Sequence, residues 1–221
     1  MKLFGSRFEQ ILAIIQKDFL IGLRQRATFA AMMMFALTAT AALSLSTNGI
    51  FIETKFLAAL LWTVIFFAAS AGIAGTFDDE ATAGTLQTLK LYADAQAILF
   101  GKMIYVFLSL VALTIFILPI FLILFDVAVK NFFLLLATIF FGLVGIAAAG
   151  TFTAALTASA TVKGGLFPIL LFPITLPIFL PAISLTEISF AGGAFDSGSL
   201  IVVAAFDLIL ITAASILYDY L

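Results

Sequence analysis

Side chains that could do chemistry gather in one segment of this chain, residues 77–102. The segment holds six of the 22 charged residues (10 Lys and Arg plus 12 Asp and Glu), namely Asp78, Asp79, Glu80, Lys90, Asp94 and Lys102. Adjacent carboxylates could bind a cation, but three in a row on a helix cannot all face one ion. They more readily favour a helix N-terminus electrostatically. The segment therefore predicts a polar contact surface and not a reaction centre.

Catalysis by histidine or cysteine is excluded, because the chain contains neither residue. Ser-His-Asp triads, Cys-His pairs and thiolate or imidazole zinc sites all need one of them. The sequence also lacks the GxxxxGK[ST] loop that binds ATP phosphates. We therefore expect no catalytic residue, no metal site and no directly bound cofactor, and we do not expect an enzyme.

The composition places the chain in a lipid bilayer. Hydrophobic residues make up 64% of it and charged residues 10%, against roughly 45–50% and 25% in soluble domains. A helix needs about 20 mostly apolar residues to cross the hydrocarbon layer. Because backbone groups in lipid must pair within their own segment, such runs are helices. The sequence predicts one all-α transmembrane domain over residues 1–221, with six spans at about 27–46, 56–75, 103–125, 131–155, 165–184 and 199–218.

The distribution of basic residues predicts the orientation. With six spans, eight Lys and Arg fall on one side, namely Lys2, Arg7, Lys17, Arg24, Arg26, Lys90, Lys102 and Lys163. Only Lys55 and Lys130 fall on the other side. By the positive-inside rule, both termini and segment 77–102 are cytoplasmic.

Residues 6–26 are patterned like an amphipathic helix that lies in the membrane interface. One face carries the apolar residues Phe8, Ile11, Leu12, Ile15, Phe19 and Leu23, and the other carries Arg7, Gln10, Lys17 and Arg24. Ile14 and Leu20 blur this division. Such a pattern is typical of helices parallel to the bilayer surface. The alternative is a basic tail that only sets topology.

Segment 77–102 divides into parts at two residues. Gly84 interrupts it, and residues 85–93 can form about two helical turns with Leu86 and Leu89 on one side. Asp94 can cap the helix that becomes the third span, with Lys102 at the level of the interface. A short helix on the cytoplasmic surface can transmit force from a soluble motor, although an ordinary loop helix would look the same.

The fifth span and its surroundings hold the candidate gate residues. Pro173, Pro177 and Pro181 recur at four-residue steps, and each removes an amide donor, so the span should bend or break towards its outer end. Residues 185–198, which include Glu187, are too short to cross and suggest a re-entrant or interfacial hairpin. Asp207 is the one deep charge, and it serves either the pathway or a bond to a hydroxyl, a backbone amide or a second subunit.

Several motifs resemble the CcmB family of cytochrome c maturation. They are Phe77-Asp78-Asp79-Glu80, Gly84-Thr85-Leu86, Leu89-Lys90-Leu91, Gly101-Lys102 and the proline-rich ILLFPITLPIFLPA. The resemblance covers nearly the whole chain and implies an ABC-2 type, or type V exporter-like, permease. Tyr92-Ala93-Asp94 replaces a frequent Ser-Pro, and Gln87 replaces a common Glu. On this resemblance, the residues expected to couple to an ATPase are Asp78, Asp79, Glu80, Gly84, Thr85, Leu86, Leu89 and Lys90.

The resemblance also implies partners. They are a CcmA-type ABC ATPase that binds the ATP, a CcmC-type haem-handling membrane protein, a small CcmD-type subunit, a CcmE-type periplasmic haem chaperone and a second copy of the chain. Nucleic acid is not expected. The implied location is the bacterial inner membrane. With no histidine, the chain cannot offer the usual axial ligand to haem, which is therefore a possible substrate coordinated by a partner.

Three functions remain open on the sequence. A permease subunit would turn ATP hydrolysis by a separate ATPase into haem export or into loading and release of the haem chaperone. A scaffold would transmit the conformational change of the ATPase without transport. An ion-coupled secondary carrier would need intramembrane charge pairs and often internal repeats, and the sequence offers Asp207 alone.

Overall fold

The computed structural model of the chain describes residues 6–24, 26–47, 50, 52–82, 84–158, 166–194 and 197–219, with the backbone alone at 78, 79, 81, 82, 86, 87 and 90. Helices make up nearly all of this described part. They are α1 (Arg7–Arg24), α2 (Arg26–Ser46), α3 (Thr54–Ile73), α4 (Gly75–Thr82), α5 (Thr85–Tyr92), α6 (Ala95–Leu124), α7 (Phe132–Ala158), α8 (Leu166–Ala191) and α9 (Ser197–Tyr218).

Six of these helices are long and apolar enough to cross a membrane: α2, α3, α6, α7, α8 and α9. This confirms the six predicted spans and the all-α membrane fold. The third span is longer than expected, because α6 begins directly after Asp94, at residue 95, and continues to Leu124. Asp94 occupies the predicted N-cap position, but its side chain makes no capping hydrogen bond.

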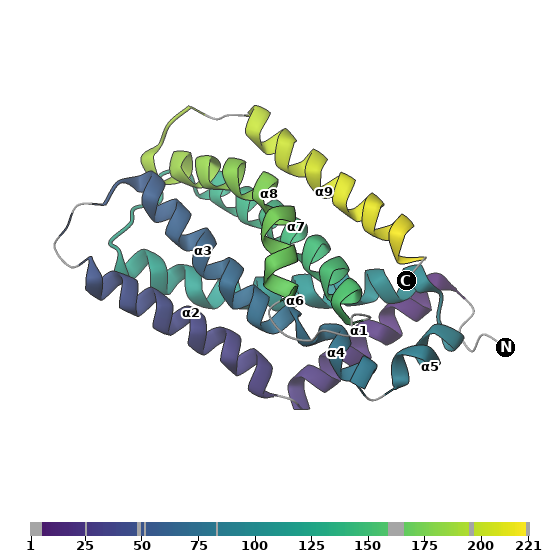
Figure 1. Cartoon of the computed structure of the whole chain (residues 1–221). Helices are drawn as coiled ribbons and strands as arrows, with labels where there is room; N and C mark the ends of the chain where they lie inside the picture. Colours follow the sequence, from purple (N-terminus) through teal and green to yellow (C-terminus); the bar gives the residue numbers. More distant parts are fainter. Residues whose placement is uncertain are drawn as a thin grey trace.

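The spanning helices form a bundle whose connections alternate between two ends (Figure 1). α4, α5, the start of α1 and the end of α9 lie together at one end, which we call the terminal end (Figure 1). α2 and α3, α6 and α7, and α8 and α9 are joined at the opposite end. α3 and α7 form the centre, since 61% of an 18-residue apolar stretch in each is buried, against 17% in α2 and α9.

Small residues bring the central helices close together. A Cβ at Gly142 of α7 would overlap the Trp62 ring of α3, and one at Gly150 would meet Ile73. Close approach of backbones is how membrane helices gain packing energy where no hydrophobic effect drives association. The glycines of α7 therefore position α3 against it.

Several buried hydroxyl groups within the spans find partners on their own helix, although those of Thr151 and Tyr218 have none among the described residues. The hydroxyls of Thr40, Ser70, Thr114 and Thr138 each donate to the carbonyl four residues earlier, at 2.7–2.8 Å. These bonds satisfy polar atoms that lipid cannot. Such residues are therefore structural fillers and not by themselves site residues.

The end of α8 differs from the sequence prediction. Residues 185–191 continue the helix, so the predicted re-entrant or interfacial hairpin is wrong for this part. The reason is a buried face that includes Leu185, Ser189 and Phe190 and that is hidden against the bundle. The helix ends at Ala191, and the next residue, Gly192, stops it with a left-handed φ of +79° and a hydrogen bond from its amide to the Ile188 carbonyl.

Candidate functional site

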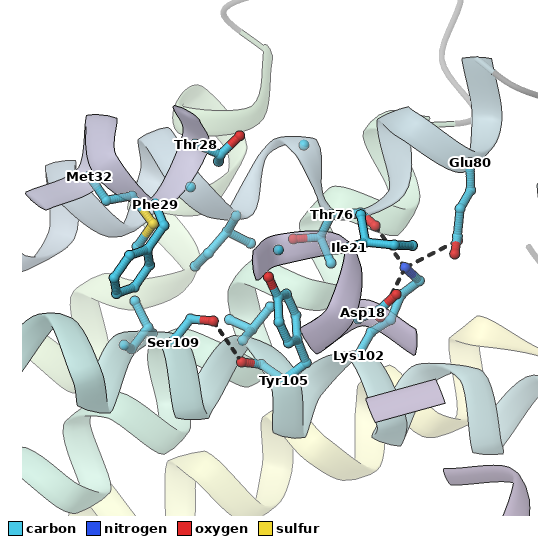
Figure 2. A pocket seen from close by; sticks show the side chains of 16 residues that line it. Asp18, Ile21, Thr28, Phe29, Met32, Thr76, Glu80, Lys102, Tyr105 and Ser109 are labelled. Carbon is cyan, nitrogen blue, oxygen red and sulfur yellow. Dashed lines mark hydrogen bonds and ion pairs between the residues drawn. The ribbon is translucent and has the colours of Figure 1, made fainter. Parts of the chain in front are cut away.

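A buried ammonium joins three helices at the terminal end. Lys102 of α6 has a side chain only 1% exposed. Its Nζ donates to the Thr76 carbonyl of α4 at 2.7 Å and lies 3.1 Å from Glu80 Oε2 and 3.4 Å from Asp18 Oδ2 of α1 (Figure 2). The predicted level of Lys102 at the membrane interface stays a prediction, and the structure adds that its side chain points into the protein.

Lys17, a partly exposed residue of α1, is the second cation of this charged group. It pairs with the Glu80 carboxylate and lies 3.0 Å from Asp18 Oδ1. Burial opposes the charge on Lys17, but its hydrogen bonds and ion pairs with Glu80 and Asp18 outweigh burial and raise its pKa above the ordinary 10.5. We call Lys17, Asp18, Glu80 and Lys102 the Lys102 cluster. Its two cations and two anions balance.

Aromatic rings extend the contacts of the Lys102 cluster. The Lys102 Nζ lies 4.8 Å from the centroid of the Phe77 ring, within the range of a cation–π contact. Phe77 in turn packs on Tyr218 at the end of α9, with ring centroids 6.1 Å apart. α4 therefore contacts α1, α6 and α9 through side chains within four positions of one another.

α1 also makes a hydrogen bond and an ion pair with Asp94, the residue directly before α6. The Asp94 amide donates to Gln10 Oε1 at 2.9 Å, and Arg7 lies 3.7 Å from the Asp94 carboxylate. Gln10, Ile14 and Asp18, at four-residue steps, form the buried row of α1. The apolar residues Phe8, Leu12, Phe19 and Leu23 are exposed. The predicted amphipathic helix is present, and its polar side faces the protein.

A cavity of ≈160 Å³ lies beside the Lys102 cluster (Figure 2). Its walls include Asp18, Glu80 and Lys102 together with Tyr105 and Met32. Gly22 allows the Tyr105 ring to stand against α1, because a Cβ there would lie 2.5 Å from the Tyr105 hydroxyl. The cavity shows that α1, α2 and α4 do not pack closely against α6 at this level.

The proline-rich helix α8 stays continuous through Pro173, Pro177 and Pro181. It changes direction partway along its length, as expected for a helix that loses several amide donors (Figure 1). Its last turns are tied to α3, since Trp62 Nε1 donates to the buried Thr186 hydroxyl at 3.0 Å. Glu187, the next residue along α8, is half-buried.

The end of α8 lies beside a second cavity, of ≈740 Å³, at the opposite end of the bundle. Its walls include Thr47, Asp126, Lys130 and Phe190. The Lys130 Nζ donates to the Ala191 carbonyl at 2.8 Å, and its amide donates to the Ser189 carbonyl at 3.0 Å. Lys130 thus caps α8, as a cation does at a helix C-terminus.

Asp207 of α9 is 3% exposed and faces the centre of the bundle. A Cβ at Gly145 of α7 would overlap its carboxylate and Ile178 of α8. Neither carboxylate oxygen has a hydrogen-bond partner among the described residues. The predicted bond to a hydroxyl or backbone amide within the bundle is therefore absent from the described part, and a role for Asp207 in a pathway stays a prediction.

A family model described as CcmB protein matches residues 9–217, which is nearly the whole chain. The chain belongs to the CcmB family. The comparison with curated proteins finds no match. Membership makes the chain a multi-pass membrane permease subunit, not itself an enzyme, of a haem-export ABC transporter for cytochrome c maturation. A transporter of this class includes an ATPase partner.

The residues that the CcmB resemblance assigned to ATPase coupling do not share one surface. Glu80 points inward to the Lys102 cluster, and Leu89 is half-buried against the core. Gly84 and Thr85 are exposed at the start of α5, where Gly84 has a φ of +68° that suits glycine. The side chains of Asp78, Asp79, Leu86 and Lys90 lie outside the described residues, and no contact with an ATPase is tested for any of these eight residues.

Two features of this CcmB-family site were missed from the sequence. Asp18 and Gln10 are buried and contact α6 and the residue before it, and their signal was two polar residues eight positions apart on one face of α1, with Ile14 between them. Leu91 and Tyr92 of α5 are exposed by 79% and 46%. They form an apolar tip on a polar segment, and their signal was the hydrophobic pair at the end of the predicted short helix.

Proposed function

We propose that this CcmB-family chain is the membrane subunit through which a separate ATPase drives haem export or the loading and release of a haem chaperone. In this proposal α4 and α5 receive the ATPase on the cytoplasmic side of the bacterial inner membrane, and a second copy completes the permease. One observation carries it: between two spans the chain places a short polar segment, α4 and α5, at the end that also holds α1 and the end of α9 (Figure 1).

The charge distribution supports the cytoplasmic orientation. Arg7, Lys17, Arg24 and Lys102 lie on described elements at the terminal end, whereas Lys55 and Lys130 lie at the opposite end. Membrane proteins keep an excess of Lys and Arg in cytoplasmic loops. An ATP-binding partner is soluble and cytoplasmic, so it meets this end.

The exposed tip of α5 offers the contact surface for that partner. Leu91 and Tyr92 are the most exposed large hydrophobic residues of the α4–α5 segment that the structure describes. Exposed apolar and aromatic residues surrounded by polar ones are typical anchors of protein interfaces. We therefore expect the ATPase to bind Leu91 and Tyr92, while Leu89 belongs to the core.

Co-purification of the ATPase tests this assignment. Leu91→Asp should abolish ATPase association, while the variant still inserts and unfolds at the wild-type temperature. Lys55→Glu, a change of charge at the opposite end, is the control and should retain the ATPase. Normal co-purification with Leu91→Asp would contradict the assignment of α5.

Transport itself is tested in sealed vesicles that hold the complete complex. ATP-dependent movement of haem across the membrane supports a permease. ATP hydrolysis that releases haem from the chaperone without any crossing would support the scaffold alternative. Haem movement that follows an ion gradient without ATP would support a secondary carrier.

A further inference from the structure

We propose that the Lys102 cluster is the positioning link that joins the ATPase-facing segment to the transmembrane bundle, so that α1, α4 and α6 move as one body. The inference rests on the proposed function for its meaning in transport. The link itself is a property of this chain and can be measured without transport.

Three helices, α1, α4 and α6, meet at the Lys102 Nζ. The Lys102 Nζ of α6 reaches Asp18 of α1, 84 positions away, and the Thr76 carbonyl of α4, 26 positions away. The Glu80 carboxylate, also on α4, lies between the two lysines. Two of these contacts are hydrogen bonds, from the Lys102 ammonium to Asp18 Oδ2 and to the Thr76 carbonyl, and the third is an ion pair with Glu80 Oε2 at 3.1 Å. Moving α4 away from α1 or α6 would break these contacts together.

Close packing between α1 and α6 ends beside the Lys102 cluster. α1 and α6 are already in direct contact, because a Cβ at Gly101 would lie 2.8 Å from Ile14. At the next turn the ≈160 Å³ cavity lies among α1, α2, α4 and α6. Since a void forfeits dispersion contacts along its walls, the ionic contacts carry the connection of α4 to the α1–α6 pair there.

α5, the proposed ATPase contact, is connected to the helices of the Lys102 cluster. Gly84, with its left-handed backbone, separates α5 from α4, and α5 is exposed at Thr88, Leu91 and Tyr92. Leu89 is its contact with the core, and α4 is the helix next to it. Movement imposed on α5 therefore reaches the bundle on one side through α4 and on the other through Ala93 and Asp94, which join α5 to α6. On α4, Glu80 and Thr76 make the polar contacts to α1 and α6.

Spin labels can report this link directly, because the chain has no cysteine. The exposed residues Gln16 of α1 and Thr88 of α5 are replaced by cysteine and labelled, and the distance distribution is measured in the complex with a cysteine-free ATPase. We expect one narrow distribution that is the same without nucleotide and with trapped ATP. In the triple variant Asp18→Asn/Glu80→Gln/Lys102→Met, which leaves Lys17 as the one charge of the Lys102 cluster, we expect at least a doubled width and a shift on ATP binding.

The second measurement is the amount of haem moved or released for each ATP that the complex hydrolyses. The triple variant should retain the ATPase and its hydrolysis rate within about twofold, but lose at least tenfold in haem moved or released per ATP. Lys102→Arg keeps the charge and should restore most of that ratio, whereas Glu9→Gln, an exposed acid on α1, should change neither readout. A narrow, nucleotide-independent distance together with wild-type coupling in the triple variant would overturn the inference.

If the proposed function is wrong, the experiments give a different result from the one expected when only the Lys102 cluster link is wrong. In that case no ATPase associates with the wild-type chain, or coupling is absent in the wild type. The distance between labels at 16 and 88 in the chain alone still tests the Lys102 cluster then. An unchanged width in the triple variant would reject the link whatever the chain transports.

Discussion

The Lys102 ammonium and the Asp18 carboxylate lie 3.4 Å apart, although 84 positions separate them in the sequence. Both side chains are buried, so neither charge is hydrated as it would be at a surface. The pair fixes an amphipathic N-terminal helix to the third span of a CcmB-family permease. It also lies beside Glu80, on the helix that leads to the proposed ATPase contact.

Removing the central cation should destabilise the chain strongly. Lys102→Met leaves the buried Asp18 and Glu80 carboxylates with the partly exposed Lys17 as the one remaining cation of the cluster. Breaking a buried ionic set typically costs about 3–5 kcal/mol. The triple variant Asp18→Asn/Glu80→Gln/Lys102→Met removes the three most buried charges, leaves only the partly exposed Lys17 charged, and should lose much less. Thermal unfolding in detergent measures both. Equal losses in the two variants would show that packing, and not charge, holds this site.

The raised pKa of Lys17 predicts that the stability of the folded chain depends on pH at alkaline pH. Its pKa in the folded chain is raised above 10.5, so the folded state holds this proton more tightly than the unfolded state. Its contribution to stability is fully present below pH 10.5 and is lost as pH rises through the folded pKa. Because Lys17 is partly exposed, we expect less than about 1 kcal/mol.

The measurement compares the wild type with Lys17→Met across pH. The difference in unfolding midpoint should be constant from neutral pH to about pH 9.5, within the range where lysine stays protonated, and should shrink at higher pH. Titration of the other lysines and tyrosines is common to both chains and cancels. A difference that grows above pH 10.5 would contradict the sign.

Gly145 should not tolerate a side chain. A methyl group there would overlap the Asp207 carboxylate and Ile178, and overpacking of this kind typically costs about 1–3 kcal/mol. Gly75→Ala is the matched control, because a Cβ there meets nothing within 4 Å. Gly75→Ala should leave the unfolding midpoint unchanged or raise it, and Gly145→Ala should lower it. A midpoint for Gly145→Ala at or above that of the control would show that Asp207 moves freely.

The bond from Trp62 to Thr186 should hold the end of α8 against α3. Thr186→Val keeps the shape but leaves the buried Trp62 N–H without its acceptor, at a cost of about 1–3 kcal/mol. Thr63→Val is the control, since the Thr63 hydroxyl is exposed and bonds only within its own helix. Trp62 is the single tryptophan, so its fluorescence should shift in Thr186→Val and stay unchanged in Thr63→Val. An unshifted spectrum in Thr186→Val would contradict the bond.

The helix boundaries show where local patterns succeed and fail. Asp94 correctly marked the start of α6, and Gly84 correctly separated α4 from α5, because caps and left-handed turns depend on neighbouring residues. The continuation of α8 through Glu187 was missed. A charged residue and a following Gly-Gly looked like a loop, yet the buried face on α3 and the cap from Lys130 keep the helix intact.

The sequence by itself determined the membrane class, the six spans and the CcmB resemblance, since hydropathy, capping and motif spacing are properties of short segments. It also located the polar segment 77–102. Only the tertiary structure decided that Glu80 and Lys102 of this segment face inward, that Asp18 meets them, and that Leu91 is left exposed. The physical reason is that these contacts depend on how α1, α4 and α6 are rotated and docked against one another. That arrangement follows from contacts between residues up to 89 positions apart.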